Sequence, residues 1–258
     1  MKPIRYLPVS PFFGQHAARL SGWKRLATKL LPMHVIPSLR NEIRMTWVRL
    51  AGHTPARRFR GSRALKVNLG SGNRGHPGWV NVDFMALPNV NCVWDCRQSL
   101  PFEDESVRVI FSEHFFEHLD YTEEIPAILA ESLRVLQPGG FIRIVVPDAG
   151  KYLRAYCESG WQALIALREL KPDHFDRYTN CAYGTKMELI NEIFRQAYTH
   201  KFAFDDETLV HLLLHCGFAH ASRAEFGRSL DPELAIDFAD RAHESLYVEG
   251  VKGGSIRS

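Results

Sequence analysis

Residues 65–83 read LKVNLGSGNRGHPGWVNVD, and this stretch decides how the rest of the chain is interpreted. An aliphatic and β-branched run stops at two glycines, Gly70 and Gly72, and a second apolar run ends on an acid, Asp83. Glycine permits backbone conformations closed to other residues and lets a ligand approach the main chain. An acid at the end of the next strand is placed to bind the two hydroxyls of a ribose. The stretch predicts an adenosine-containing ligand.

The sequence after Asp83 alternates short apolar runs with a helical pattern. We expect a third strand that ends at Asp95, a fourth over residues 107–111 and a fifth over residues 141–146. Between the fourth and fifth strands, apolar residues recur at helical spacing and predict a helix. Thr122 is placed to cap this helix at its start, and a Pro-Gly-Gly sequence ends it. This order predicts an α/β, Rossmann-like, doubly wound and mostly parallel sheet with its ligand at the carboxyl ends of the strands.

The order of these pieces resembles the class I S-adenosylmethionine-dependent methyltransferases, and in particular their type 11 branch. The segments that carry the resemblance lie between residues 65 and 148: NLGSG, VDF, WDCRQSLPFEDES, SEHFFEHL and LRVLQPGGFIRIVVPD. The resemblance implies S-adenosyl-L-methionine as cofactor and a terminal antiparallel strand. It also implies a cofactor site: Gly70, Ser71 and Gly72 at the methionine part, Asp83 at the ribose, Asp95 and Cys96 at the adenine, and Ser112 along the methionine portion.

The chain departs from the dinucleotide-binding pattern in its first crossover. Only thirteen positions separate Gly70 from Asp83, against about twenty in the Rossmann fingerprint. Residues 70–79 contain Pro77 and four glycines, so they predict a turn or loop instead of a crossover helix. A pyrophosphate needs a proper helix start, which argues against a dinucleotide. The short crossover also supports an alternative hypothesis, in which the protein binds S-adenosylmethionine without catalysis and acts as a partner or scaffold.

The reaction implied by the resemblance is in-line displacement of a methyl group from a sulfonium. If the acceptor is a hydroxyl, a general base is useful, and the candidates near the strand ends are His114, His118, Asp148 and His200, with His114 and Asp148 preferred. Chains of this branch suggest a small, glycan or lipid-linked acceptor, which is an argument by association.

One motif competes with this interpretation. His114, Glu117 and His118 match H-x-x-E-H, the inverted zinc peptidase signature. Two histidines four apart on a helix face suit zinc, and Glu188 or Glu192 offers a third ligand. The motif nevertheless starts just after the fourth strand, among cofactor signals that a peptidase does not need. We therefore predict no functional metal.

The charge of the chain is strongly asymmetric. Residues 1–63 carry thirteen Lys and Arg against one acid, Glu42, a net charge of +12, whereas residues 64–258 carry −9. This division predicts a basic helical N-terminal extension (residues 1–63) before a methyltransferase-like domain (residues 64–258). Two apolar helix faces lie within the extension, one around Trp23 and one formed by Leu39, Ile43, Trp47 and Leu50. Such faces either pack on the acidic domain or contact an anionic membrane. No nucleic-acid motif accompanies the charge.

Residues 150–200 exceed a normal connection and predict a helical insertion over the strand ends. Its aromatic residues either contact a sugar or lipid acceptor or form the core of the insertion itself. After it we expect a helix over 205–216 and two closing strands near 220–226 and 245–251. Five cysteines without metal-pair spacing favour reduced thiols and a cytoplasmic protein. The absence of a long apolar run argues against a membrane-spanning helix.

Overall fold

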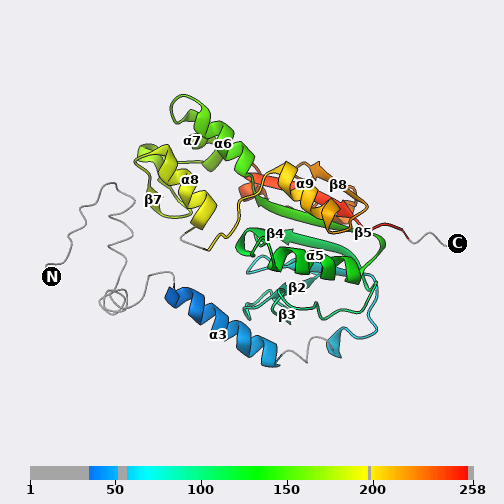
Figure 1. The fold of residues 1–258 in the computed structure, drawn as a ribbon. Helices are drawn as coiled ribbons and strands as arrows, with labels where there is room; N and C mark the ends of the chain where they lie inside the picture. Colours follow the sequence, from blue (N-terminus) through cyan, green and yellow to red (C-terminus); the bar gives the residue numbers. More distant parts are fainter. Residues whose placement is uncertain (1–34, 52–56, 197–198, 255–258) are drawn as a thin grey trace.

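The computed structural model describes residues 35–51, 57–196 and 199–254. Its centre is a seven-stranded sheet in the order β3-β2-β1-β4-β5-β9-β8 (Figure 1). The strands of this sheet are β1 (Leu65–Leu69), β2 (Val80–Asp83), β3 (Cys92–Val93), β4 (Val107–Glu113), β5 (Leu136–Pro147), β8 (His220–Ala224) and β9 (Ser245–Val251). All pairs from β3 to β5 are parallel, whereas β9 runs antiparallel to both β5 and β8.

This arrangement confirms the predicted mostly parallel, doubly wound sheet with an antiparallel strand formed near the end of the chain. The strand order reverses between β1 and β4, so the connections that leave these two strands diverge at their carboxyl ends. Ligands of open α/β sheets bind in the crevice at such a reversal.

The first crossover contains no helix, as predicted from its length and its glycines. Asparagine side chains brace it instead. Asn81 on β2 accepts a hydrogen bond from the backbone N–H of His76 and donates one to the His76 carbonyl. Asn91 donates to the Trp79 carbonyl and accepts from the Asn81 N–H, while Asn68 on β1 donates to Asn81. These bonds satisfy backbone groups that a helix would otherwise satisfy internally.

Helices cover one face of the sheet and an irregular segment covers the other. The helices beside the sheet are α5 (Glu124–Val135), which packs near β5, and α9 (Asp206–His215), which packs on β8 and β9. Their apolar sides join one core cluster with the sheet. The opposite face buries Trp79, Phe111 and Tyr247 against the β8–β9 connection, which carries the short turns η4 (Pro232–Leu234) and η5 (Ala239–Arg241).

Two local expectations were wrong. Thr122 does not cap α5, because its hydroxyl donates to Asp120 Oδ1 and the helix begins at Glu124 without a side-chain cap. Asp120 instead accepts the backbone N–H groups of Thr122 and Glu123. The fifth strand also begins before the Pro-Gly-Gly sequence, at Leu136, and its pairing with β4 shifts register there. Gly139 has a φ of +77°, which suits glycine at this irregularity.

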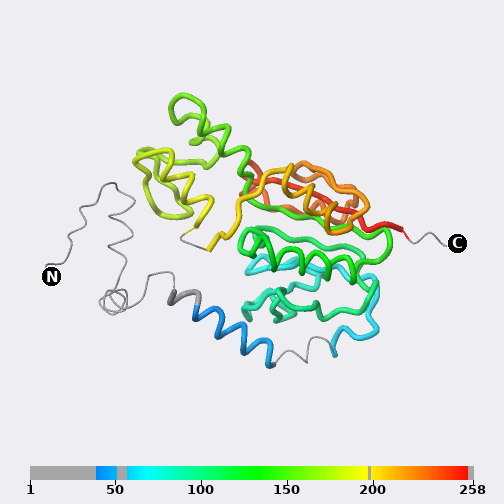
Figure 2. Tube along the Cα trace, viewed as in Figure 1, coloured from blue at the N-terminus to red at the C-terminus, as the bar shows by residue number. Residues whose placement is uncertain are grey.

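The predicted insertion is helical and lies beside the sheet (Figure 2), and it has a hydrophobic core of its own. Its elements are α6 (Ala149–Cys157), α7 (Gln162–Arg168), η2 (Pro172–His174), a two-stranded ribbon of β6 (Phe175–Asp176) and β7 (Cys181–Ala182), and α8 (Lys186–Arg195). Tyr152 and Tyr183 are completely buried in that core, and Trp161 stacks on His174. Of the two roles considered for these aromatics, the structure therefore shows internal packing for Tyr152, Tyr183 and Trp161.

The extension contributes helix α3 (Val35–Ala51), which contacts the sheet domain through charged residues. Arg49 pairs with Asp95, and Glu42 pairs with Arg97. The predicted apolar face is exposed: Leu39, Ile43, Trp47 and Leu50 are each more than half accessible. The helix face around Trp23 lies outside the described residues. Within the described part, no helix has both the length and the apolar character needed to cross a membrane.

Candidate active site

The glycine turn after β1 is joined to the acid at the end of β2. Gly70 and Gly72 have φ values of +66° and +51°. Asp83 accepts the N–H of Gly72 at 2.9 Å through Oδ2 and the N–H of Met85 at 2.8 Å through Oδ1. Burial raises the pKa of Asp83, and these backbone hydrogen bonds oppose the rise. The sequence prediction that the turn and the acid form one site is consistent with this geometry.

Two further observations mark the turn as a ligand site. The hydroxyl of Ser71 is buried and has no hydrogen-bond partner, an arrangement that costs about 1–3 kcal/mol unless a ligand or water supplies one. The Phe115 ring packs directly on Gly70, where a Cβ atom would lie 2.3 Å from it. The turn thus needs glycine at position 70 both for its backbone angle and for this close contact.

Asp95, predicted at the adenine, lies in a network of arginines. It accepts hydrogen bonds from Arg97 and, at 2.9 Å, from Nε of Arg49 on α3. Burial alone would raise the pKa of Asp95, but the bonds from Arg97 and Arg49 outweigh burial and lower it. Cys96 beside it is buried, and burial raises the pKa of its thiol well above the usual value. This part of the site therefore presents a carboxylate and a neutral thiol.

Ser112 near the end of β4 is completely buried and donates a hydrogen bond to the Leu69 carbonyl at 3.1 Å. This bond ties β4 to β1 beside the glycine turn. The predicted position next to the turn is therefore correct in the fold, while a direct role of Ser112 toward the cofactor stays a prediction.

His114 follows β4 with a φ of +52°, a conformation that is uncommon for a residue other than glycine. Its backbone N–H donates to the Val145 carbonyl at 2.8 Å, so the strained residue is held against β5. Its Nδ1 lies 3.2 Å from Glu117 Oε1 and its Nε2 lies 3.2 Å from Ser245 Oγ. Strain of this kind is retained where the surrounding structure fixes it, often at functional sites.

Glu117 brings together His114 and His200, two of the four predicted base candidates. It is almost completely buried, and its Oε1 lies 3.2 Å from His114 Nδ1 and 4.0 Å from His200 Nε2. Burial by itself would raise the pKa of Glu117, but the hydrogen bond from His114 and the nearby His118 and His200 lower it to about 2. Burial lowers the pKa of His200 to about 4. At neutral pH the carboxylate is ionised and His200 is uncharged.

Asp148 is placed differently from the two histidines. It caps helix α6, where its Oδ1 accepts the N–H of Lys151 at 2.9 Å, and its Oδ2 lies 3.4 Å from Arg223. Its side chain is almost completely buried. These contacts give Asp148 a structural function in the described chain.

Sequence reasoning missed Glu113, the last residue of β4. Burial raises the pKa of Glu113 to about 7, and its Oε2 is buried without a hydrogen-bond partner. A carboxyl with a pKa near neutrality at the carboxyl end of a central strand is a candidate acid or base. The available signal was an acid next to Ser112 at a strand end, which is weak because the groups that act on its pKa, such as Arg74 and Asp237, are distant in sequence.

The H-x-x-E-H motif does not form the helix that a zinc peptidase requires. Its first histidine lies just beyond β4, and only Phe116–His118 form the short turn η1. Both ring nitrogens of His114 already have partners, Glu117 and Ser245. The peptidase arrangement of two histidines on one helix face is therefore wrong for this chain.

The fold and the site define the class of protein. The sheet order, the glycine turn and the strand-end acids are those expected of a class I methyltransferase. A family model described as a methyltransferase domain matches residues 82–144. The resemblance predicted from the sequence is thus confirmed for this part of the chain, which is similar to the methyltransferase domain of S-adenosylmethionine-dependent enzymes of the type 11 branch.

Solved structures with similar folds have low sequence identity to this chain. A methyltransferase from Thermotoga maritima, described as a possible histamine N-methyltransferase, is 15% identical over 85% of this chain and 98% of its own, with a TM-score of 0.45. A methyltransferase from Archaeoglobus fulgidus is 20% identical over 83% of this chain and 94% of its own, with a TM-score of 0.43. A third structure is phosphoethanolamine N-methyltransferase 2 of Haemonchus contortus in complex with phosphomonomethylethanolamine and S-adenosylhomocysteine. It is 13% identical over 76% of this chain and 51% of its own, with a TM-score of 0.43. No curated protein matches the sequence.

The residues of the glycine turn fit the cofactor. The unpartnered Ser71 hydroxyl and the buried Asp83 carboxylate offer a donor and an acceptor for a polar ligand. Asp95 already accepts hydrogen bonds from Arg49 and Arg97, so a ligand amino group would have to share its oxygens with them. The cofactor supplies an activated methyl group, so the protein mainly aligns reactants and excludes water.

Proposed function

We propose that this chain methylates a hydroxyl group and that His114 is the general base. The observation that carries the proposal is the strained His114, whose Nδ1 faces the buried Glu117 carboxylate at the carboxyl end of β4. A carboxylate on one ring nitrogen fixes the tautomer, so that the other nitrogen is the one that accepts a proton. In this proposal Nε2, which now faces Ser245, accepts the proton of the acceptor hydroxyl.

The remaining site residues are proposed to bind and orient. Gly70, Ser71 and Gly72 hold the methionine part, Asp83 the ribose, and Asp95 the adenine amino group, with Cys96 and Ser112 beside them. Of the other base candidates, His200 is kept as a neighbour of Glu117, whereas the capping contacts of Asp148 argue against it. Glu113 is the competing base, because its pKa of about 7 suits proton transfer at neutral pH.

The proposed acceptor is a small or lipid-linked molecule, with a glycan hydroxyl as the first choice. Support comes from the exposed apolar face of α3, which lies on the same helix as the Arg49 that contacts Asp95. A lipid-linked acceptor presented at a membrane would meet the enzyme near this helix. We favour the enzyme over a non-catalytic scaffold because His114 lies 3.2 Å from the buried Glu117 carboxylate, a pairing that a general base requires.

The test is turnover with candidate acceptors. Purified protein, S-adenosylmethionine and panels of free glycans, lipid-linked glycans and small hydroxyl or amine compounds are incubated, and S-adenosylhomocysteine and methylated product are measured together. Product that carries an O-methyl group supports the proposal. Cofactor binding without turnover on any class would favour the scaffold, and N-methylated product would refute the hydroxyl acceptor.

We further propose that residues 1–63 act as an extension to the domain of residues 64–258 and attach the enzyme peripherally to the cytoplasmic leaflet. The four exposed apolar residues of α3 and the +12 charge of the extension support this placement, since each basic residue near an anionic surface adds about 1 kcal/mol. We expect flotation with anionic liposomes that falls with added salt. Replacing Ile43 and Trp47 by Ser should abolish flotation while cofactor binding survives. Flotation unchanged by these substitutions would contradict the role of α3.

A further inference from the structure

Among the residues that the structure describes, Glu117, His118 and His200 form a group in which one ligand atom of each lies within 4.8 Å of the others. Two members come from the turn after β4, and the third comes from the segment that returns from the insertion to the sheet. Backbone bonds hold these segments together, because Lys201 and Phe202 both donate their N–H groups to the Glu117 carbonyl. The group therefore does not depend on flexible surface side chains alone.

Both histidines have their Nδ1 atoms committed to backbone carbonyls. His200 Nδ1 lies 2.7 Å from the Ile193 carbonyl, and His118 Nδ1 lies 3.0 Å from the Thr199 carbonyl. A carbonyl only accepts, so each Nδ1 carries a hydrogen that it donates. Metal-binding histidines have this arrangement, with one N–H donated to a carbonyl or carboxylate and the other nitrogen left for the metal.

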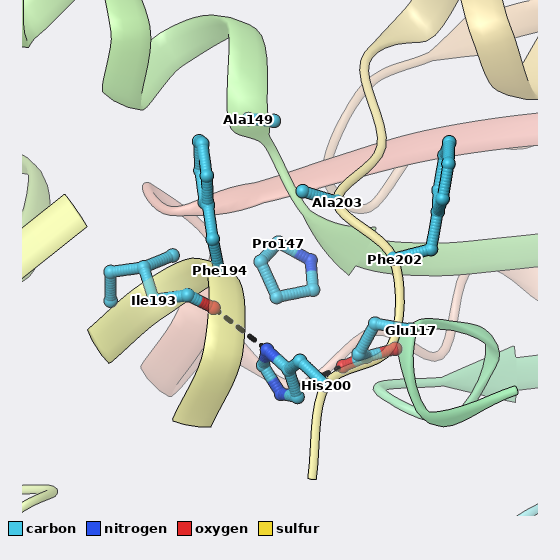
Figure 3. A pocket seen from close by; sticks show the side chains of 8 residues that line it. All are labelled: Glu117, Pro147, Ala149, Ile193, Phe194, His200, Phe202 and Ala203. Carbon is cyan, nitrogen blue, oxygen red and sulfur yellow. Dashed lines mark hydrogen bonds and ion pairs between the residues drawn. The ribbon is translucent and has the colours of Figure 1, made fainter. Parts of the chain in front are cut away.

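The third member of the group, Glu117, has a carboxylate oxygen without a hydrogen-bond partner. Glu117 Oε2 is buried and lacks a hydrogen-bond partner, while Oε1 faces His200 Nε2 across 4.0 Å. Figure 3 shows His200 and Glu117 facing each other at one side of a small cavity, with Phe194 and Phe202 beside it. Its volume is about 10 Å³, on the order of what a single water or ion needs.

We propose that Glu117, His118 and His200 bind a divalent transition-metal ion, with zinc as the preferred ion. Imidazole and carboxylate ligands suit zinc, and three protein ligands leave a fourth position for water or substrate. The set differs from the peptidase motif, because His114 is excluded and His200 comes from a distant segment. The proposal revises the sequence prediction of no functional metal, and it does not depend on the identity of the methyl acceptor.

Metal binding would require a small contraction of the group. Zinc binds nitrogen and oxygen at about 2.0–2.2 Å, so ligand atoms around a tetrahedral ion lie about 3.4 Å apart. The present separations, up to 4.8 Å, must shorten by up to about 1.4 Å. A shift of the partly exposed His118 side chain toward Glu117 supplies such a movement, and it leaves in place the bonds from Lys201 and Phe202 to the Glu117 carbonyl.

The test uses the tag-free full chain, stripped with a chelator and titrated with Zn²⁺ by calorimetry and with Co²⁺ by absorption spectroscopy. We expect about one equivalent to bind and the cobalt spectrum to show nitrogen and oxygen ligands in a low-coordinate site. His118→Ala, His200→Ala and Glu117→Gln should each weaken binding by at least about tenfold. Metal should also raise the melting temperature of the wild type and not that of these variants.

The matched control is the His211→Ala, His215→Ala double variant, which removes a stacked pair of exposed histidines on α9. It should bind zinc as the wild type does. Binding lost in this control but retained in His118→Ala would overturn the proposal, and so would absence of saturable binding to the wild type. If His200→Ala fails to fold, the other two variants test the proposal. His118 is partly exposed, and Glu117→Gln preserves the shape of the side chain, so both variants are expected to fold. Metal binding is read without methyl transfer, so its failure is distinguishable from failure of the proposed reaction.

Discussion

The glycine turn and the histidine group, meaning here His114 and His200 around Glu117, are built in different ways. The turn, Asp83 and the asparagine brace come from residues close in sequence, and backbone groups make most of their hydrogen bonds. The histidine group joins the end of β4, the start of β9 and the chain after the insertion. The first region is fixed by local backbone geometry, whereas the second exists only when distant elements pack. Changes in the first should therefore affect binding and stability, and changes in the second should affect catalysis.

The largest expected effect is on catalysis in the histidine group. His114→Ala should lower kcat by about 10²–10⁴-fold, the range for loss of a general base, with little change in S-adenosylmethionine affinity. Steady-state kinetics and calorimetry measure the two quantities. The exposed His220 provides the control, and His220→Ala should behave as the wild type. Unchanged kcat in His114→Ala, with a large loss in Glu113→Gln, would transfer the role of base to Glu113.

A large effect on stability is expected in the glycine turn. Gly70→Ala would be destabilised in two ways: its methyl group would lie 2.3 Å from the Phe115 ring, and alanine would have to adopt a positive φ. We expect about 2–4 kcal/mol lower free energy of unfolding, from overpacking and backbone strain together. Gly72→Ala is the matched control, because its φ is also positive but its Cβ would meet nothing within 4 Å. Urea denaturation that gives equal losses for both variants would contradict the proposed close packing.

A smaller effect is expected on cofactor binding. Asp83→Ala removes a buried carboxylate from the turn and should weaken S-adenosylmethionine binding by about 1–3 kcal/mol, the cost of lost charge-assisted hydrogen bonds. Isothermal titration calorimetry measures the change, and Asp104→Ala, at an exposed acid, is the control. Binding of NADH in place of S-adenosylmethionine by the wild type would refute the cofactor assignment itself.

The smallest expected effect is a pH dependence of stability at the end of β4. Burial raises the pKa of Glu113 from 4.5 to about 7, so the folded protein keeps a proton that the unfolded chain has lost. Stability from this group is complete below about pH 4.5 and declines as the pH rises to about 7, by about 1–2 kcal/mol after allowance for partial exposure. Glu113→Gln should remove this slope, measured as the difference in unfolding free energy between pH 5 and pH 7.5. A slope that persists in the variant would assign the dependence to another group.

Much of the fold could be predicted because its signals are local. The apolar runs of β1, β2 and β4, the helical spacing in α5 and the position of α9 each depend on a few adjacent residues. The predictions that failed depend on competition between neighbours. Thr122 was a suitable cap by type, yet Asp120 lies close enough to take both its hydroxyl and the free backbone groups. Such a choice between two capable residues depends on the path of the chain, which packing determines.

The sequence by itself determined the order of strands and helices, the short crossover and the glycine turn with its acid, because chain connectivity and backbone conformation act over short distances. Only the tertiary structure decided that Asp148 caps a helix, that the insertion buries Tyr152 and Tyr183, and that His200 reaches Glu117. These outcomes depend on which distant segments share a buried volume. Side-chain type limits which segments can pack together, and the packing of the whole domain determines which of them do.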